Sequence, residues 1–110
     1  MFVAVVDGAV AGFVAGHRTT RHNCQGELEW INVARQQRGR GIAVRLLATM
    51  ARWFVEQQAL RVCVDVVPQN EPARTLYAQC GAVDLQPNWM VWEDIRTALA
   101  GSDSETTFGV

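Results

Sequence analysis

The sequence contains no lysine, and all ten of its basic residues are arginine. A phosphate-binding P-loop, which reads Gly-x-x-x-x-Gly-Lys-Ser/Thr, is therefore excluded. The Gly-x-Gly-x-x-Gly pattern of dinucleotide-binding folds is also absent, because Gly39-Arg40-Gly41 is followed by Ala43 and Val44. Internal repeats and low-complexity runs are missing as well. Two common nucleotide-binding signatures are thus removed from consideration.

Neither sign of charge is in excess, since the net charge at pH 7 is −1. The global electrostatics therefore predict neither a nucleic acid nor a membrane as a partner. Segment 1–15 is apolar, but it lacks a basic start and is interrupted by Asp7-Gly8. We expect neither a signal peptide nor a membrane span. The composition, 49% hydrophobic and 19% charged, is that of a globular protein.

Cysteine is scarce, and the three residues present, Cys24, Cys63 and Cys80, lack the spacing of a metal site. We interpret them as reduced thiols of a cytoplasmic protein, with Cys63 and Cys80 as small core residues. A thiol nucleophile would have no companion motif. His17 and His22 are interpreted as surface residues of a loop region, and no metal ion is expected.

The periodicity of the sequence predicts one α/β domain over residues 1–100, followed by a flexible polar tail over 101–110. Near the N-terminus, Asp7-Gly8 predicts a hairpin turn between antiparallel strands at 2–6 and 10–18. Beyond this hairpin, the pattern predicts a strand at 27–33, a helix at 41–58, a strand at 61–67 and a second helix at 71–80. A closing hairpin is predicted between 83–85 and 90–93.

The strand–helix–strand order in the middle of the chain implies a right-handed crossover and a parallel strand pair. Strict alternation places two sets of side chains on opposite faces of the third strand: Glu27, Glu29, Ile31 and Val33 on one, Leu28, Trp30 and Asn32 on the other. The buried stripe of the first helix comprises Ile42, Leu46, Leu47, Met50, Trp53 and Phe54. Asn70 predicts the start of the second helix, and Gly81 its end.

The turn between the third strand and the first helix is the most informative local feature. Gly39 and Gly41 leave the backbone free of side chains where it enters the helix. The first amides of a helix have no internal partner and carry the positive end of its dipole, so such a turn favours an anion, a pyrophosphate above all. Most of the arginines lie between residues 35 and 61, which fits a polyanionic ligand or a solvated helix face.

The turn itself reads Arg38-Gly39-Arg40-Gly41-Ile42-Ala43 and follows a strand that ends in Ile31-Asn32-Val33. Further along, Asn70-Glu71-Pro72-Ala73-Arg74-Thr75-Leu76-Tyr77-Ala78-Gln79-Cys80-Gly81 opens and closes the second helix. These stretches resemble motif A (Gln/Arg-x-x-Gly-x-Gly/Ala) and motif B (Asn-x-x-Ala-x-x-Leu-Tyr-x-x-x-Gly) of the GNAT superfamily of acyl-CoA-dependent N-acetyltransferases. The one departure noted is Arg35, where these proteins often have proline. As architecture, the resemblance covers residues 2–95.

The resemblance implies a GNAT-like mixed sheet, α/β (α+β), and acetyl-CoA as the cofactor. By this resemblance, the backbone of Ile31, Asn32 and Val33 would pair with the pantetheine amides, and Asn70 and Arg74 would contact the cofactor from the second helix. The pyrophosphate would be held by Arg38, Gly39, Arg40, Gly41, Ile42, Ala43 and Val44. The two parallel strands must separate for the thioester to enter, and Pro68 would help to end their pairing.

Acetyl transfer from a thioester to an amine requires a base for the amine, a polarised carbonyl and a proton for the leaving thiolate. The resemblance assigns the proton donor to Tyr77; the alternative is a buried aromatic residue with a satisfied hydroxyl. The candidate bases are Asp65, which would need a water relay, and Glu29 on the neighbouring strand. Either could instead be a solvated carboxylate. Partial burial between apolar strands would raise its pKa toward a useful value.

Relatives begin with a strand and two helices that form much of the acceptor site, whereas Met1 here leads straight into the counterpart of their second strand. We therefore expect the acceptor half to be absent or supplied by a partner. The flank that it would cover should be apolar, which favours a homodimer or a marginally soluble monomer. Trp89 and Trp92 are candidates for an interface, and for one of the two we expect ordinary core packing.

The leading hypothesis is an acetyl-CoA-dependent N-acetyltransferase that acts on a primary amine of a small molecule or a protein. One alternative is a truncated CoA-binding module with a regulatory or structural role and little catalysis. Another is an αβ interaction domain without a ligand. Acetyl-CoA binding would exclude the last, and turnover on an amine would separate the first two.

Overall fold

The computed structural model describes residues 1–39, 41–101 and 107–109. Within these residues, the strands form one seven-stranded mixed sheet in the order β5-β6-β4-β3-β2-β1-β7. The strands are β1 (Phe2–Val6), β2 (Ala9–Arg18), β3 (Gly26–Val33), β4 (Val62–Asp65), β5 (Val83–Gln86), β6 (Trp89–Trp92) and β7 (Thr107–Gly109). The helices are α1 (Ile42–Glu56) and α2 (Glu71–Gln79), with 3₁₀ segments η1 (Arg21–Asn23), η2 (Arg35–Gln37) and η3 (Ile95–Gly101). The predicted fold class is confirmed.

The first hairpin forms as predicted. β1 and β2 pair antiparallel, and the turn residues Asp7 and Gly8 have φ angles of 52° and 80°. Two consecutive positive φ angles are the signature of the type I′ turn, whose twist matches that of the flanking strands. The local sequence is therefore sufficient to place this turn. β2 then pairs antiparallel with β3 along most of its length.

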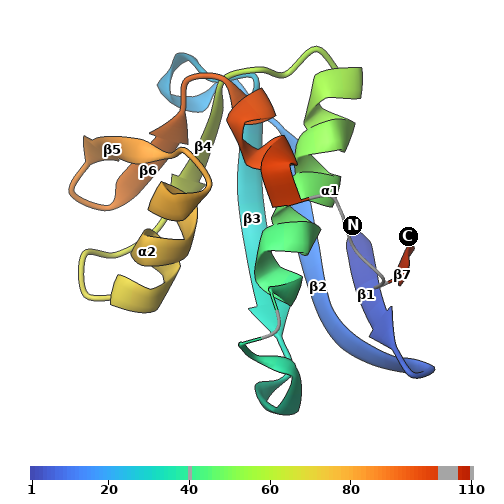
Figure 1. Cartoon of the computed structure of the whole chain (residues 1–110). Helices are drawn as coiled ribbons and strands as arrows, with labels where there is room; N and C mark the ends of the chain where they lie inside the picture. The colour runs from blue at the N-terminus through green and yellow to red at the C-terminus, as the bar shows by residue number, and fades with distance from the viewer. Residues whose placement is uncertain (40, 102–106, 110) are drawn as a thin grey trace.

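The crossover from β3 through α1 to β4 is also confirmed, since β3 and β4 are parallel neighbours. α1 lies across β2 and β3, and η3 lies against α1 (Figure 1). The close approach of α1 depends on a glycine in β3: a Cβ on Gly26 would lie 2.6 Å from the Phe54 ring. The buried face of α1 contains Ile42, Leu46, Leu47, Met50 and Phe54, and Trp53 is half-buried.

α2 begins at the predicted residue and ends one residue before the predicted Cys80, which is its C-cap. The Asn70 side chain accepts a hydrogen bond from the Ala73 amide at 3.3 Å, which satisfies one of the free amides of the first turn. At the other end, Gly81 has a φ of +104°, a conformation that favours glycine after a helix. Tyr77 of α2 and its C-cap Cys80 belong to the same core cluster as Leu46 of α1, so both helices pack on one face of the sheet.

The closing hairpin of β5 and β6 is confirmed, and β6 inserts beside β4 in antiparallel orientation. Of the two tryptophans on β6, Trp92 is fully buried and donates its indole N–H to the Cys80 carbonyl at 3.1 Å. Trp89 is half-buried, and its ring packs against the His22 ring with the two ring centroids 4.5 Å apart. The prediction that one of them is ordinary core is thus confirmed for Trp92. All three cysteines are free and buried.

The prediction of strict alternation along β3 is wrong after Leu28. Ala15 pairs with Trp30 and Gly16 with Leu28, so Glu29 has no partner of its own on β2 and forms a β-bulge. The extra residue reverses the faces that follow it. Leu28 is buried, Trp30 is 59% exposed, and Ile31 packs against the core instead.

The end of the chain contributes a short strand. Thr107–Gly109 pairs antiparallel with β1, within the segment for which a flexible tail is predicted. Residues 102–106 and 110 of that segment lie outside the described residues. Ahead of it, η3 buries Ile95 and Ala98, and a Cβ on Gly81 would lie 2.3 Å from the Thr97 hydroxyl oxygen. The packed part of the chain therefore extends to η3.

Candidate functional site

The parallel pair of β3 and β4 opens into a fork. The two strands pair at only three positions, from Gly26 with Val62 to Leu28 with Val64. Beyond them, the backbone N–H of Val66 donates to the Asn88 carbonyl at 2.8 Å, so β4 turns toward the β5–β6 hairpin. We call Glu29–Val33 the β3 arm and residues 65–68 the β4 arm. The predicted separation of the strands agrees with this geometry.

The β3 arm presents one unpaired edge. Ile31, Asn32 and Val33 pair with β2 on one side. On the other side, no strand among the described residues pairs with them, because the ladder with β4 ends at Leu28. The backbone N–H and C=O groups of an open edge are available to an extended amide-containing ligand.

The turn after the β3 arm leads into α1 with the geometry expected of an anion site. Arg38 is extended and exposed, Gly39 has a φ of +83°, and Gly41, the N-cap of α1, has a φ of +75°. Nothing lies within 4 Å of a Cβ built on Gly39. No side-chain hydrogen bond caps α1 in the part of the chain that the structure describes. The turn precedes the helix body and faces solvent.

The other residues of the predicted anion site divide into two groups. Ile42 is buried, and Ala43 and Val44 are half-buried in the first turn of α1, so only their backbone amides are candidates for ligand contact. Arg38 donates from Nε to the Val33 carbonyl at 3.2 Å, which ties the turn to the end of the β3 arm. Arg40 lies outside the described residues.

The two α2 residues predicted to contact the cofactor are both engaged within the fold. The Asn70 side chain caps α2. Arg74 is turned into the molecule, and its guanidinium donates to the carbonyls of Val66 and Val67 at 2.9 and 3.3 Å and to Asp84 Oδ1 at 3.0 Å. Motif spacing could not reveal these partners, because they come from other elements.

Tyr77 lies in the core, 6% exposed, in the cluster that also includes Leu28 and Val64, the last paired residues before the fork. Burial raises the pKa of its hydroxyl to about 12, because the apolar surroundings disfavour the phenolate. Among the described residues, no hydrogen bond is made by this hydroxyl. A neutral hydroxyl that has no partner among the described residues is able to donate to a ligand.

The two candidate carboxylates stand on different arms of the fork. Glu29 is the bulged residue of the β3 arm, and Asp65 is the last residue of β4; both are exposed. Neither is buried between apolar strands. Glu29 Oε2 lies 3.8 Å from His17 Nε2, which is also 3.9 Å from Glu27 Oε2. The sequence did not indicate this histidine, because only the β2–β3 register brings it to Glu29.

Two further properties of the described residues complete the picture. No group of three or more His, Cys, Asp or Glu side chains in them is arranged to hold a metal ion. No helix among them is both long and apolar enough to cross a membrane.

Comparison with known proteins gives one consistent result. The sequence profile described as "Acetyltransferase (GNAT) family" matches residues 1–82. Streptothricin acetyltransferase from Escherichia coli is 31% identical over 78 residues, which are 71% of this chain and 44% of that protein. The chain thus spans less than half the length of this curated relative.

Solved structures show the same fold. Ard1 from Thermoplasma volcanium has a TM-score of 0.71 at 23% identity, over 81% of this chain and 65% of that one. The NatC complex bound to Gag peptide and CoA contains a chain with a TM-score of 0.69 at 16% identity, over 81% of this chain and 65% of that one.

Proposed function

The chain belongs to the acetyltransferase (GNAT) family, and we propose that it transfers an acetyl group from acetyl-CoA to a primary amine. One observation carries this proposal: an exposed turn with positive φ angles at Gly39 and Gly41 continues into the unpaired edge of the β3 arm, which ends at the fork. An anion site, an edge for amides and an opening between strands follow one another along the chain. This order matches the pyrophosphate, the pantetheine and the thioester of acetyl-CoA.

The residues present fit acetyl-CoA in the following way. Backbone amides between Arg38 and Val44 would hold the pyrophosphate, with the dipole of α1 adding to the attraction. Backbone groups of Ile31–Val33 would pair with the pantetheine. The fold is shared with the NatC structure, which was determined with CoA. Acetyl-CoA, when bound, supplies the thioester that is to be transferred.

Tyr77 is the proposed proton donor. Because its hydroxyl stays protonated at neutral pH, it can donate to the sulfur as the carbon–sulfur bond breaks. It then regains a proton from solvent.

A carboxylate at the fork would accept the proton that the ammonium form of the acceptor loses. We favour Glu29 over Asp65, because Glu29 stands at the bulge where the strands part and has the longer side chain. Asp65 would act through a bridging water.

The acceptor is a primary amine of a small molecule or of a protein. The name of the Escherichia coli relative makes streptothricin the first small molecule to test. Peptides with a free N-terminus represent the protein class. The alternative function, a CoA-binding module with little catalysis, is favoured by one observation: both candidate bases, Glu29 and Asp65, are exposed.

One experiment separates these functions. Calorimetry with acetyl-CoA measures binding, and release of the CoA thiol over the amine panel measures transfer. We expect binding together with turnover on at least one amine. Binding without turnover on any amine would support the CoA-binding module, and no binding would contradict both functions.

We also propose a homodimer formed through the sheet face opposite the helices. Val3 pairs with Phe13, and Ala15 with Trp30, so these apolar side chains lie together, half-buried to exposed. Val14, which points the other way from β2, is fully buried. An exposed apolar patch of this kind favours association. The free cysteines agree with the proposed cytoplasmic location.

A further inference from the structure

We propose that Arg74 is a positioning residue that fixes the β4 arm against α2 and thereby sets the place of the Tyr77 hydroxyl at the fork. The proposal rests on the proposed acetyl transfer for its functional meaning. Its structural part concerns only contacts within this chain. It replaces the expectation that Arg74 contacts the cofactor.

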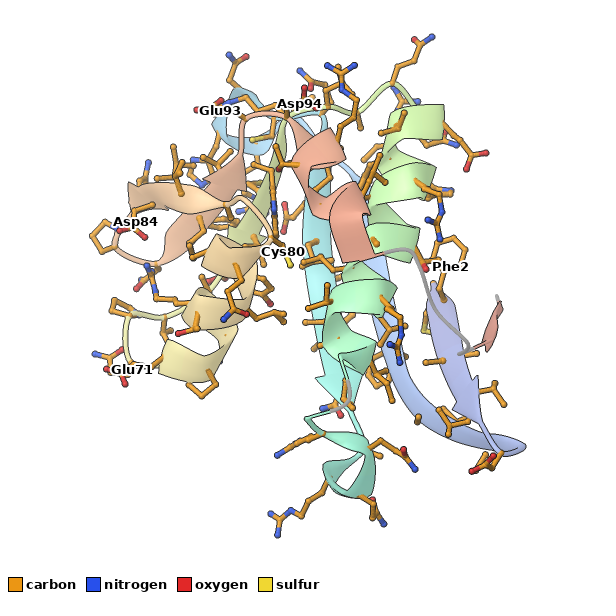
Figure 2. All side chains as sticks on the ribbon, viewed as in Figure 1. Phe2, Glu71, Cys80, Asp84, Glu93 and Asp94 are labelled. Carbon is orange, nitrogen blue, oxygen red and sulfur yellow. The ribbon has the colours of Figure 1, made fainter. Side chains whose placement is uncertain are left out.

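Arg74 joins three separate segments of the chain. Its Nη2 donates to the carbonyls of Val66 and Pro87, its Nε to the carbonyl of Val67, and its Nη1 to Asp84. The segments are the β4 arm, the β5–β6 turn and β5, and Arg74 itself belongs to α2. Its side chain is only 19% exposed. In Figure 2, Asp84 lies on the side of α2 away from α1, so the guanidinium is directed away from the anion-binding turn.

The β4 arm needs such a partner. Its neighbour in the sheet, β3, stops pairing at Leu28, and the Val66 N–H is bonded to Asn88. Among the described residues, the Val66 carbonyl would otherwise depend on solvent for its hydrogen bond, whereas the Val67 carbonyl also accepts from the Asn70 N–H at 3.1 Å. A planar guanidinium with donors in fixed directions can satisfy several carbonyls at once, which a lysine ammonium does less well.

We call the hydrogen bonds from Arg74 to the carbonyls of the β4 arm the Arg74 clamp. This clamp is linked to Tyr77 through one turn of α2. Tyr77 follows Arg74 by three positions on α2, and Val66 of the clamped arm lies in the same core cluster as Tyr77. Arg74 hydrogen-bonds the β4 arm, and Val66 and Tyr77 contribute to the same core, so we treat the β4 arm, Arg74 and Tyr77 as one unit. A displacement of about 1 Å in a reacting group can lower a rate by roughly 100-fold. Loosening this unit should therefore reduce turnover more than cofactor affinity.

The experiment uses Arg74→Met, which keeps the aliphatic length but removes the donors, and Arg74→Lys, which keeps the charge. Asp84→Asn is the matched control, because it alters the partner with the 80% exposed side chain and leaves the three carbonyl bonds in place. Each variant is measured for acetyl-CoA affinity, for kcat and KM, and for ionisation of tyrosine by ultraviolet absorbance. Tyr77 is the single tyrosine of the chain, so the absorbance reports on it alone.

For Arg74→Met we expect kcat to fall by about 10- to 100-fold, acetyl-CoA affinity to change less than kcat does, and Tyr77 to ionise at a lower pH than in the unmodified protein. The direction in which the pKa of Tyr77 changes is informative. Loss of a nearby cation would by itself raise the pKa of Tyr77, so a decrease reports that its surroundings have opened. Arg74→Lys should change in the same direction by less, and Asp84→Asn should change little. In a Tyr77→Phe background, Arg74→Met should lower kcat no further.

Two results would overturn the proposal. Loss of acetyl-CoA affinity with unchanged tyrosine ionisation would show that Arg74 is a cofactor contact after all. Unchanged kcat and unchanged ionisation in Arg74→Lys, or in Arg74→Met where it folds, would show that the clamp positions nothing. If the unmodified protein has no transferase activity, the ionisation measurement still tests the link between Arg74 and Tyr77. Failure of the proposed acetyl transfer and failure of the proposed role of Arg74 are therefore distinguishable.

Discussion

The ring of Tyr77 packs edge-on against the ring of Trp92, with centroids 5.6 Å apart and planes at 72°. Trp92 is in turn held by its hydrogen bond to the Cys80 carbonyl. The phenol of α2 is thus supported by a buried ring of β6. This contact keeps the Tyr77 side chain in the core, and the proposed role requires its hydroxyl to reach a ligand that enters between the strands.

Removal of the Tyr77 hydroxyl should affect chemistry more than folding. Tyr77→Phe keeps the ring contact, and the hydroxyl makes no hydrogen bond within the described part of the chain. We expect turnover to fall by about 100-fold or more and the free energy of unfolding to change by less than about 0.5 kcal/mol. Thiol-release kinetics and denaturant unfolding measure the two quantities. Unchanged turnover would remove Tyr77 from the mechanism.

The alkaline behaviour of Tyr77 follows from its burial. The pKa of Tyr77 in the folded protein is about 12, against about 10 for an exposed tyrosine. The contribution of this group to stability is fully present below about pH 10 and is lost as the pH rises toward the folded value, because the unfolded chain releases the proton first. Tyrosine absorbance should therefore show little ionisation at about pH 10 in the folded protein and half-ionisation there in denaturant. Half-ionisation at that pH in the folded protein would contradict the burial.

Gly41 and Gly8 form a matched pair for testing the anion site. Both have positive φ, +75° and +80°, and neither Cβ would meet an atom closer than 3.7 Å. Replacement by alanine should cost each variant about 1 kcal/mol of stability through backbone strain. Only Gly41→Ala should also weaken acetyl-CoA binding, by about 10-fold or more, because only Gly41 lies among the amides proposed to bind the pyrophosphate. Calorimetry on both variants is decisive, and equal affinities would place the cofactor elsewhere.

The two carboxylates of the fork can be separated by isosteric amides. Glu29→Gln should lower turnover by about 100-fold if Glu29 accepts the proton, whereas Asp65→Asn should have a smaller effect. Both side chains are exposed, so neither change should reduce stability appreciably. The rates are compared at saturating acetyl-CoA. A larger loss in Asp65→Asn would assign the base to Asp65, and small losses in both would exclude a carboxylate base at the fork.

The proposed dimer depends on Trp30, which is 59% exposed. Trp30→Ser should shift the protein from dimer to monomer without loss of stability, since the side chain is not part of the core. Val83→Ser is the control, because Val83 is 52% exposed on the edge strand β5, away from the patch. Sedimentation velocity at several concentrations measures the change. A monomer at all concentrations in the unmodified protein would refute the proposed dimer.

The elements that could be predicted from the sequence are those whose signals are local. Asp7-Gly8 specifies its turn because only a few residue types accept positive φ at both positions. Asn70 and Gly81 bound α2 through a side-chain cap and a left-handed residue. The 3.6-residue period of α1 identifies its buried face. In each case, neighbours within a few residues supply the constraint.

The sequence by itself determined the order of the strands β1 to β6 and of the two helices, the start of α2 and the glycine-bearing turn before α1. Only the tertiary structure decided that Glu29 bulges, that Trp92 is buried and that the Arg74 donors are taken up by carbonyls of β4 and the β5–β6 turn. Strand register and side-chain partners depend on residues far apart in the chain, and their energies are settled only when the sheet assembles. For this reason, motif spacing indicated which residues are candidates for a site at the fork, whereas packing determined what each of them contacts.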